Sequence, residues 1–211
     1  SYALKISLEE AFKGVEKQIT FFNMVSCSSC KGHGSNDGQS KDCSYCHGQG
    51  AVRVQQGFFA VEQTCHKCQG QGQIISNPCV TCGGAGRKKD KIVKNITIPA
   101  GIQDEQRIKY SGDGEAGMRG GGAGDLYVAI EVAPHKFFKI DNIDLHCRVP
   151  ISYTHAVLGG AIEVPVIEGG SVKVSIPAGT QNDTKLKLKA KGMPKIRSNN
   201  ARGDMFVHVV I

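Results

Sequence analysis

Tryptophan is absent from this chain of 211 residues, and aromatic residues make up only 6% of it. Stacking platforms for single-stranded nucleic acid depend on aromatic side chains, so this composition argues against one. No apolar run approaches the length that spans a bilayer, and no signal-peptide pattern opens the chain. The chain starts at Ser1 rather than at Met, so we expect a fragment or a processed product.

The catalytic patterns of common hydrolases are missing as well. Neither a pair of carboxylates nor a Ser-His-Asp arrangement can be argued from residue spacing. The glycine-rich stretch 120–124 precedes a strand pattern and has no Lys-Ser or Lys-Thr after it. It is therefore interpreted as a loop rather than as a phosphate-binding motif. We expect this protein not to be an enzyme.

One pattern dominates the chain instead, because C-x-x-C-x-G-x-G occurs four times. The copies are Cys27–Gly34, Cys43–Gly50, Cys65–Gly72 and Cys79–Gly86. Two thiolates separated by two residues can bind one face of a zinc ion, and the next glycine lets the backbone turn back beneath the metal. Eight cysteines complete two closed tetrahedral sites. We predict two structural Zn²⁺ ions as cofactors, and metal thiolates favour a reducing, cytoplasmic location.

The formal charge of +7 changes when the metal is counted. Eight thiolates contribute eight negative charges and two zinc ions four positive ones, which leaves +3. This charge is weak, and no recognition helix of the two-Cys, two-His finger type is present. Nucleic acid is therefore not the expected partner, and a nucleic-acid-binding zinc protein is kept only as a minor alternative.

Four cysteine pairs can share two ions in three ways, and the residues between the second and third pairs favour one of them. Ala51–Val54 and Phe58–Gln63 have strand patterns on either side of Gly57, which predicts a hairpin. The hairpin brings the second and third motifs together, and its base juxtaposes the first and the fourth. The expected ligands are Cys27, Cys30, Cys79 and Cys82 for the first zinc, and Cys43, Cys46, Cys65 and Cys68 for the second. Eight cysteines satisfy both ions without the nearby His33, His47 and His66.

The flanks of the cysteine segment repeat each other. Ile98–Gly101 recurs as Ile176–Gly179, and Gly124–Val128 recurs as Gly203–Val207, at offsets of 78 and 79 residues. A cysteine segment occurs in the first copy only, so we predict that it is inserted there. The expected domains are a first β-domain (1–26 and 87–136), an inserted zinc module (27–86) and a second β-domain (137–211).

Apolar and polar residues alternate in both copies, as in strands that bury one face. The inward positions are Leu126, Val128, Ile130 and Val132 in the first copy, and Leu145, Cys147, Val149 and Ile151 in the second. Only 8–14 and 153–159 have a helical pattern. The stretch 185–191 alternates lysine with leucine, which indicates a strand with a solvated basic face. The expected fold is mainly β, with two similar β-sandwich-like domains in tandem and an elongated, hairpin-rich module interrupting the first.

Together these features resemble the DnaJ family of co-chaperones, and most closely its zinc-containing bacterial type. The resemblance covers essentially the whole chain, including 56–61 in the hairpin and 112–117 after the first repeat. It implies the same nested pairing of cysteine motifs. It also implies a function, which is to bind exposed apolar segments of non-native polypeptides, prevent their aggregation and hand them to a DnaK-type ATPase chaperone.

Some parts of that family have no counterpart in this sequence. The His-Pro-Asp signature of the J-domain does not occur, the Gly/Phe-rich linker is missing, and the chain ends at Ile211 before the family's dimerisation segment. We therefore expect a substrate-binding fragment that holds clients but does not stimulate the ATPase. The full-length protein is expected to be a homodimer, and the fragment could be a monomer.

The segment 17–25 is largely apolar on both faces, which leaves two interpretations. It could be a strand between two layers, or an exposed groove at a sheet edge where an extended client adds a strand. The family has a hydrophobic client pocket in its first β-domain, which favours the second interpretation, and Met24 would add an adaptable side chain. The expected client contacts are Leu4, Ile19, Phe21, Met24, Ile96 and Val128.

A second function stays open, because C-x-x-C pairs can carry out thiol–disulfide exchange and the family has been linked to such activity. Zinc-bound thiolates are occupied, however, and nothing in the chain resembles the βαβ setting of a thioredoxin motif. Holding of clients is the main prediction, and zinc-dependent exchange is the alternative.

Overall fold

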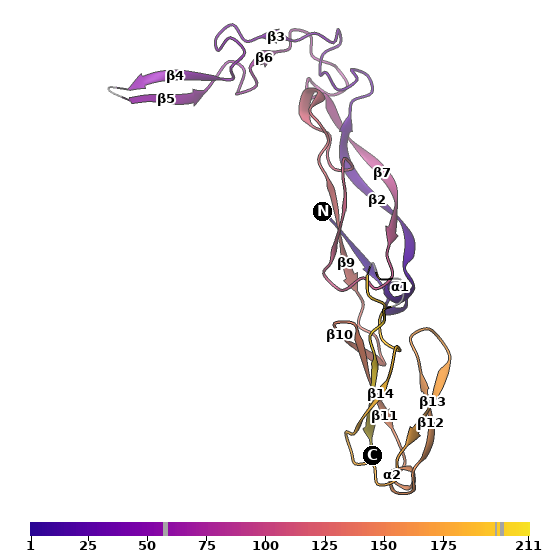
Figure 1. Cartoon of the computed structure of the whole chain (residues 1–211). Coiled ribbons are helices and arrows are strands. Elements are labelled where there is room, and N and C mark those ends of the chain that lie inside the picture. The colour runs from indigo at the N-terminus through magenta and orange to yellow at the C-terminus, as the bar shows by residue number, and fades with distance from the viewer. Residues whose placement is uncertain (57–58, 197, 199–200) are drawn as a thin grey trace. The chain divides into compact units, whose positions relative to one another are not determined.

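The computed structural model describes residues 1–56, 59–196, 198 and 201–211, and it confirms a mainly β fold made of several small sheets (Figure 1). Its elements in chain order are β1 (Tyr2–Ile6), α1 (Leu8–Lys13), β2 (Val15–Ser26), β3 (Lys41–Asp42), β4 (Ala51–Gln56), β5 (Phe59–Thr64), β6 (Gln73–Ile74), β7 (Arg87–Ile98), β8 (Arg107–Tyr110), the 3₁₀ turn η1 (Met118–Gly120), β9 (Leu126–Val132), β10 (Phe138–Asp141), β11 (Asp144–Pro150), α2 (Tyr153–Leu158), β12 (Gly160–Pro165), β13 (Ser171–Ile176), β14 (Lys185–Leu188) and β15 (Met205–Val210).

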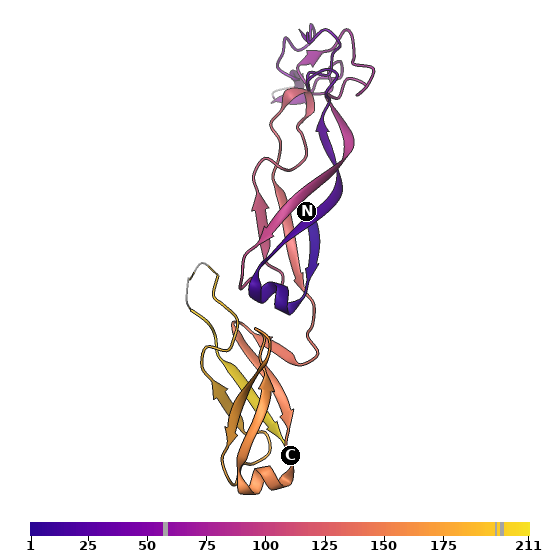
Figure 2. The same ribbon diagram turned by 90° about the vertical axis from the view of Figure 1, so that its right-hand side faces the viewer.

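The first repeat combines a three-stranded sheet with a two-stranded ribbon. β1 pairs in parallel with β9, β8 lies on the other side of β9, and β2 pairs with β7. Figure 2 shows the twist of the β2–β7 ribbon. Alternation along β9 buries Leu126, Val128 and Ile130, and β7 contributes the buried Ile96 and Ile98. Period-two patterning in the sequence therefore marks the inner face of this repeat correctly.

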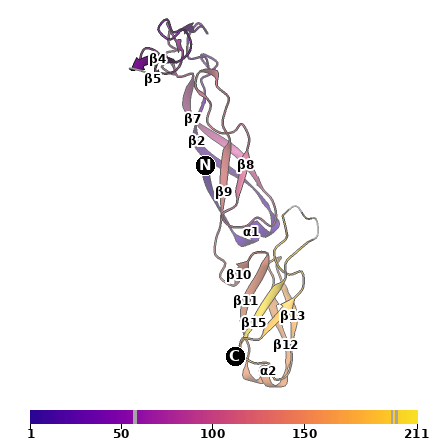
Figure 3. The same ribbon diagram turned by 60° about the vertical axis from the view of Figure 1, so that its left-hand side comes forward.

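The second repeat has the same plan with one extra strand. β11 pairs in parallel with β15 and antiparallel with β10, while β12 and β13 form a ribbon (Figure 3). Val164 pairs with Val172, which confirms the hairpin predicted around 168–170. Cys147 is a core residue, as expected, because it is 2% exposed and burial raises the pKa of its thiol to about 11.

Equivalent contacts support the duplication at the atomic level. Gly14 ends α1 at φ +75°, and a Cβ there would lie 3.0 Å from the carbonyl oxygen of Ile98. Gly159 ends α2 at φ +78°, and a Cβ there would lie 2.9 Å from the carbonyl oxygen of Ile176. Ile98 and Ile176 open the two Ile-Pro-Ala-Gly copies, so each repeat closes its helix against the same point of its own ribbon.

Both helices match their sequence predictions and are short. Ser7 caps α1 in a capping box with Glu10, and Ser152 accepts a hydrogen bond from the backbone N–H of His155 at the start of α2. Each helix has six residues.

The part of the chain that the structure describes contains no helix with the length and apolar character needed to span a bilayer.

The cysteine segment connects β2 to β7, at the place where the second repeat has the short turn between β12 and β13. Within it, β4 and β5 pair antiparallel from Ala51 opposite Thr64, which confirms the predicted hairpin. The turn predicted at Gly57 lies outside the described residues. A second short ribbon joins β3 to β6.

The chain divides into two compact units that do not follow the predicted domain boundaries. One unit contains 1–19, 93–109 and 127–211, and the other contains 20–92 and 110–126. The cysteine segment therefore shares a unit with parts of β2 and β7 and with the loop before β9. The boundaries 1–26, 27–86, 87–136 and 137–211 stay a prediction.

An ion-pair cluster in the second repeat yields the first testable prediction. Glu168 accepts hydrogen bonds from Lys191 and Arg202, the latter at 2.7 Å, and these bonds lower the pKa of its carboxyl group. A lowered pKa stabilises the fold above the unfolded pKa of the carboxyl group, about 4.3, and this stabilisation disappears as the pH falls through the folded value. Glu168→Gln should therefore lower the unfolding free energy by only about 1 kcal/mol at pH 7, since the three side chains are still 24–32% exposed and solvent screens their charges.

The measurement is urea unfolding of both proteins at pH 7 and at pH 3. The difference between them should be smaller at pH 3, because pH 3 lies below the unfolded pKa and the stabilisation is lost progressively as the pH falls from there through the lowered folded pKa. A difference that persists unchanged at pH 3 would contradict the electrostatic explanation.

Candidate metal centres and client surface

The structure brings the eight predicted ligands together in two groups of four. The first cluster is Cys27, Cys30, Cys79 and Cys82, and the second cluster is Cys43, Cys46, Cys65 and Cys68. Within each cluster the Sγ atoms all lie within 4.8 Å of one another. Only Cys82 is not fully buried. His33, His47 and His66 belong to neither cluster, and their side chains are exposed.

The spacing of the sulfurs fits a tetrahedral ion. The Sγ–Sγ distances are 3.7 Å for Cys30–Cys82, 3.9 Å for Cys43–Cys65 and 3.6 Å for Cys46–Cys68. A zinc ion with bonds of about 2.3 Å to four sulfurs sets each S–S edge at about 3.8 Å. All of these cysteines are free thiols rather than disulfides. Both donor sets can therefore hold a thiophilic divalent metal.

A backbone N–H group donates a hydrogen bond to the second cysteine sulfur of every motif. Gly34, Gly50, Gly72 and Gly86, the last glycine of each motif, donate to the Sγ of the second cysteine at 3.2 Å. A donor aimed at sulfur stabilises the thiolate, which is the form that binds metal. The spacing C-x-x-C-x-G-x-G thus supplies both the ligands and their hydrogen-bond donors.

The same last glycines lock the motifs together in pairs, a role that the sequence argument did not assign. Cys43 N–H donates to the carbonyl of Gly72 at 2.7 Å, and Cys65 N–H donates to that of Gly50 at 2.9 Å. A Cβ on Gly72 would overlap the carbonyl oxygen of Gly48, and one on Gly50 would overlap that of Gly70. The first cluster has the same reciprocal contacts. Recurrence of the glycine at a fixed distance from the cysteines was the available signal.

Burial and backbone donors move the thiol pKa values in opposite directions. The N–H of Cys30 lowers the pKa of Cys27 to about 7, whereas burial raises the pKa of Cys30 to about 11. In the second cluster the N–H of Cys46 lowers the pKa of Cys43, and burial raises that of Cys46 to about 11. A buried cluster of four thiolates therefore needs a cation to balance its charge.

The predicted client residues do not form one exposed surface. Ile19, Ile96 and Val128 are at most 2% exposed, so in this structure they offer little area to a client. Leu4, Phe21 and Met24 are partly exposed.

The other face of β2 is open. Phe22 is 68% exposed, and the Nζ of Lys89 lies 5.5 Å from the centre of its ring. A strand between two layers would bury Phe22, so no second layer of described residues covers this face of β2; binding of a client here stays a prediction. β2 also pairs only with β7 among the described strands, which leaves its second edge without a partner strand.

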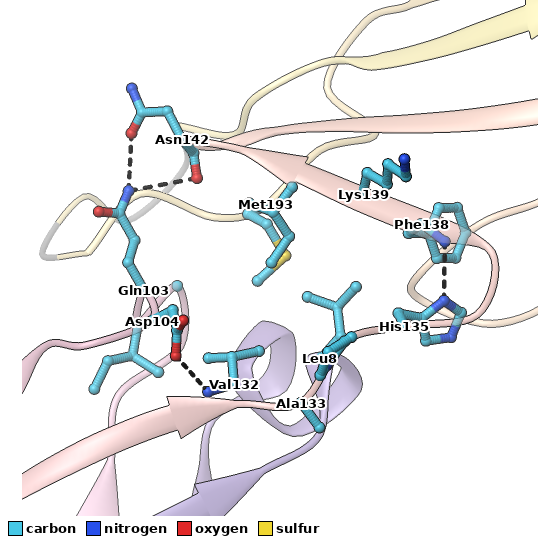
Figure 4. Close-up of a pocket in the computed structure, with 14 residues that line it drawn as sticks. Leu8, Gln103, Asp104, Val132, Ala133, His135, Phe138, Lys139, Asn142 and Met193 are labelled. Carbon is cyan, nitrogen blue, oxygen red and sulfur yellow. Dashed lines mark hydrogen bonds between the residues drawn. The ribbon is translucent and has the colours of Figure 1, made fainter.

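A separate cavity of about 580 Å³ lies outside this predicted surface. Its walls include Ile102 and four residues labelled in Figure 4, which are Leu8, Val132, Phe138 and Met193. Two hydrogen bonds brace the walls, from Val132 N–H to Asp104 and from Phe138 N–H to His135. None of the six predicted client residues lines the cavity. Sequence reasoning missed it because its walls come from segments that are distant from one another in the sequence.

Taken together, these features define a duplicated β-protein with two four-cysteine centres inserted in its first repeat. All of the chain, residues 1–211, matches the family described as DnaJ C terminal domain, and the chain belongs to that family. The prediction of this family is confirmed.

Similar proteins from three Rickettsia species agree with this assignment. The chain is 57% identical over 209 residues to the chaperone protein DnaJ of Rickettsia typhi, and 56% identical over 209 residues to that of Rickettsia prowazekii. It is 54% identical over 211 residues to that of Rickettsia akari. These matches cover 99–100% of this chain but only 56–57% of each relative. The chain thus spans little more than half the length of these relatives.

Proposed function

We propose that this chain is the client-holding part of a DnaJ-type co-chaperone. The observation that carries the proposal is the family match over the entire chain, in which both four-cysteine clusters are complete. The part binds apolar segments of non-native polypeptides and keeps them from aggregating. It then passes them to a DnaK-type ATPase, and it works in the cytoplasm, where thiols stay reduced.

The metal proposal is two Zn²⁺ ions, one in each cluster. Tetrahedral sulfur spacing, N–H donors to the thiolates and complete burial of most ligands support it. Cys27, Cys30, Cys79 and Cys82 would hold the first ion, and Cys43, Cys46, Cys65 and Cys68 the second. Bound zinc supplies cross-links that stiffen the inserted module, and four protein ligands leave no position for a reacting group. We therefore assign the cysteines no catalytic role.

The client surface proposal centres on the β2 edge of the first repeat. An extended client would add backbone hydrogen bonds along a strand edge and place its apolar side chains against Phe21 and Met24, which belong to one compact unit. Leu4, Ile19, Ile96 and Val128 belong to the other unit, and their part in client binding stays a prediction. Support comes from the second edge of β2, which pairs with no other described strand although the loop residue Ala116 donates to the carbonyl of Met24, and from the partial exposure of Phe21 and Met24.

A test of the client surface replaces Phe21 and Met24 with Ser in one protein. Its apparent affinity for an unfolded client should fall at least about fivefold, which corresponds to losing about 1 kcal/mol of apolar contact. Binding is measured by fluorescence anisotropy with a labelled, reduced and unfolded client. Val80→Ser is the matched control, because Val80 is 90% exposed in the cysteine module and lies outside the proposed surface.

Circular dichroism and zinc content must be unchanged in both variants for the comparison to hold. Ile19 is unsuitable for this test because serine at a 2% exposed core position would destabilise the fold. Equal client affinity in the double variant and the unmodified chain would eliminate the β2 edge as the client surface.

A further inference from the structure

The two cysteine clusters have the same donors but different surroundings. Beside the first cluster lies a loop, residues 111–125, that connects β8 to β9 and contains the turn η1. The backbone N–H of Arg119 donates to the carbonyl of Ala85 at 3.2 Å, and its Nε donates to the carbonyl of Gly84 at 3.3 Å. Both acceptors belong to the fourth cysteine motif. Arg119 therefore contacts the first cluster's own backbone.

Arg119 adopts a backbone conformation that side chains disfavour. Its φ is 49° and its ψ is 50°, in the left-handed region where non-glycine residues are strained. The atom Nη1 is buried and has no hydrogen-bond partner in the described part of the chain. Strain and an unpaired buried donor both carry a cost, so a compensating interaction at this place is expected.

The rest of the loop is anchored to both strands that enter the cysteine module. Ala116 N–H donates to the carbonyl of Met24 in β2 at 2.7 Å, and the Arg87 guanidinium of β7 donates to the carbonyl of Ala116 at 3.0 Å. These bonds hold the loop where the ribbon meets the first cluster. The loop that carries Arg119 is thus held next to the fourth motif by hydrogen bonds to β2 and β7.

The residue that precedes the first cysteine also differs between the clusters, since it is Ser26 before Cys27 and Asp42 before Cys43. A Cβ on Gly48 would lie 3.7 Å from the Asp42 side chain, whereas one on Gly32 in the first cluster would lie 3.7 Å from the Ser26 hydroxyl and 3.8 Å from Gly120. A zinc ion with four thiolates has a net charge of about −2. A guanidinium beside such a centre stabilises it, and a carboxylate destabilises it.

We propose that Arg119 is a positioning residue for the first metal centre and makes that centre retain its ion longer than the second. The guanidinium offsets the negative charge of the tetrathiolate centre. The bonds to Gly84 and Ala85 hold the fourth motif in its ligating conformation. Outer-shell groups of this kind tune metal affinity without touching the metal. The inference rests on the proposed function of the clusters as zinc centres.

The test is the kinetics of zinc release from the fully loaded chain into excess 4-(2-pyridylazo)resorcinol, followed by absorbance. Two phases of one equivalent each are expected, and Cys79→Ser and Cys65→Ser assign them to the first and second centres. Arg119→Gly should accelerate the slow phase about tenfold and leave the fast phase unchanged. Glycine tolerates a φ of 49°, so this variant removes the guanidinium without adding backbone strain.

Three further variants separate charge from position. Arg119→Lys keeps the charge but lacks the Nε donor, so its slow phase should be intermediate. Asp42→Ser copies the residue that precedes Cys27 and should slow the fast phase. Lys136→Ala removes an exposed cation elsewhere and should change neither phase.

Release of both ions in one phase from the unmodified chain, or an unchanged slow phase in Arg119→Gly, would overturn the inference. Binding of fewer than two zinc equivalents before any chelator is added would instead contradict the proposed function of the clusters.

Discussion

Removal of both metal ions is expected to unfold the cysteine module while the two β repeats remain folded. The buried residues at the centre of each cluster are cysteines. Val52 and Ile74 are partly buried and pack against the second cluster. A module whose interior is sulfur cannot offset its own conformational entropy without the ion. Structural zinc contributes an apparent ~10–16 kcal/mol per site in small zinc-binding peptides.

The repeats have apolar cores that do not involve the metal. Val128 and Ile130 of β9 and Val207 and Val209 of β15 are completely buried. After chelation, hydrogen exchange followed by mass spectrometry should show rapid exchange in 27–86 and retained protection in β9 and β15. Re-addition of zinc should restore protection in the module, which controls for irreversible oxidation of the thiols. Protection in 27–86 that survives complete zinc removal would contradict the expectation.

Gly72→Ala should be among the most damaging single substitutions in the module. Gly72 has φ +74°, and a Cβ would overlap the carbonyl oxygen of Gly48 in the partner motif. Backbone cannot move aside as a flexible side chain can, so the second and third motifs would separate. The expected loss is about 3 kcal/mol of stability, combining left-handed strain with steric overlap. The second cluster should also lose most of its bound zinc.

Gly38→Ala is the matched control for this substitution. Gly38 has a similar φ of +71°, but no atom lies within 4 Å of the position its Cβ would occupy. It should therefore cost only about 1 kcal/mol, from backbone strain alone. Both variants are compared by zinc stoichiometry and by thermal unfolding at a fixed zinc concentration. If Gly38→Ala reduced zinc binding as much as Gly72→Ala, interlocking of the motifs would not be the cause.

The fold followed from local patterns wherever one face of a strand is buried. Alternation placed Val128 and Cys147 inward, and repeated phrases revealed the duplication. The Ala51–Gln56 and Phe59–Thr64 hairpin followed from strand patterns around a glycine, and it carries the second and third motifs into one cluster. These features depend on residues near one another in the sequence, which is why the sequence could predict them.

The predicted client surface is an example of what local sequence patterns cannot predict. Residues 17–25 are apolar on both faces, and alternation cannot say which face another element covers. In the folded chain Ile19 on one face of β2 is 2% exposed and Phe22 on the other face is 68% exposed, so the two apolar faces have opposite environments. The predicted contacts Ile19, Ile96 and Val128 are at most 2% exposed in the folded chain, which alternation alone could not establish.

The sequence by itself determined the eight sulfurs, their nested pairing and the duplicated β architecture. Each of these features follows from short spacings between residues or from a sequence motif that recurs. Tertiary structure alone decided the overlap that a side chain at Gly72 would cause, the cavity beside Leu8, and the contact of Arg119 with Gly84, 35 residues away. The physical reason is that such contacts form between segments that are distant in the sequence, and local periodicity does not predict which distant segments will be in contact.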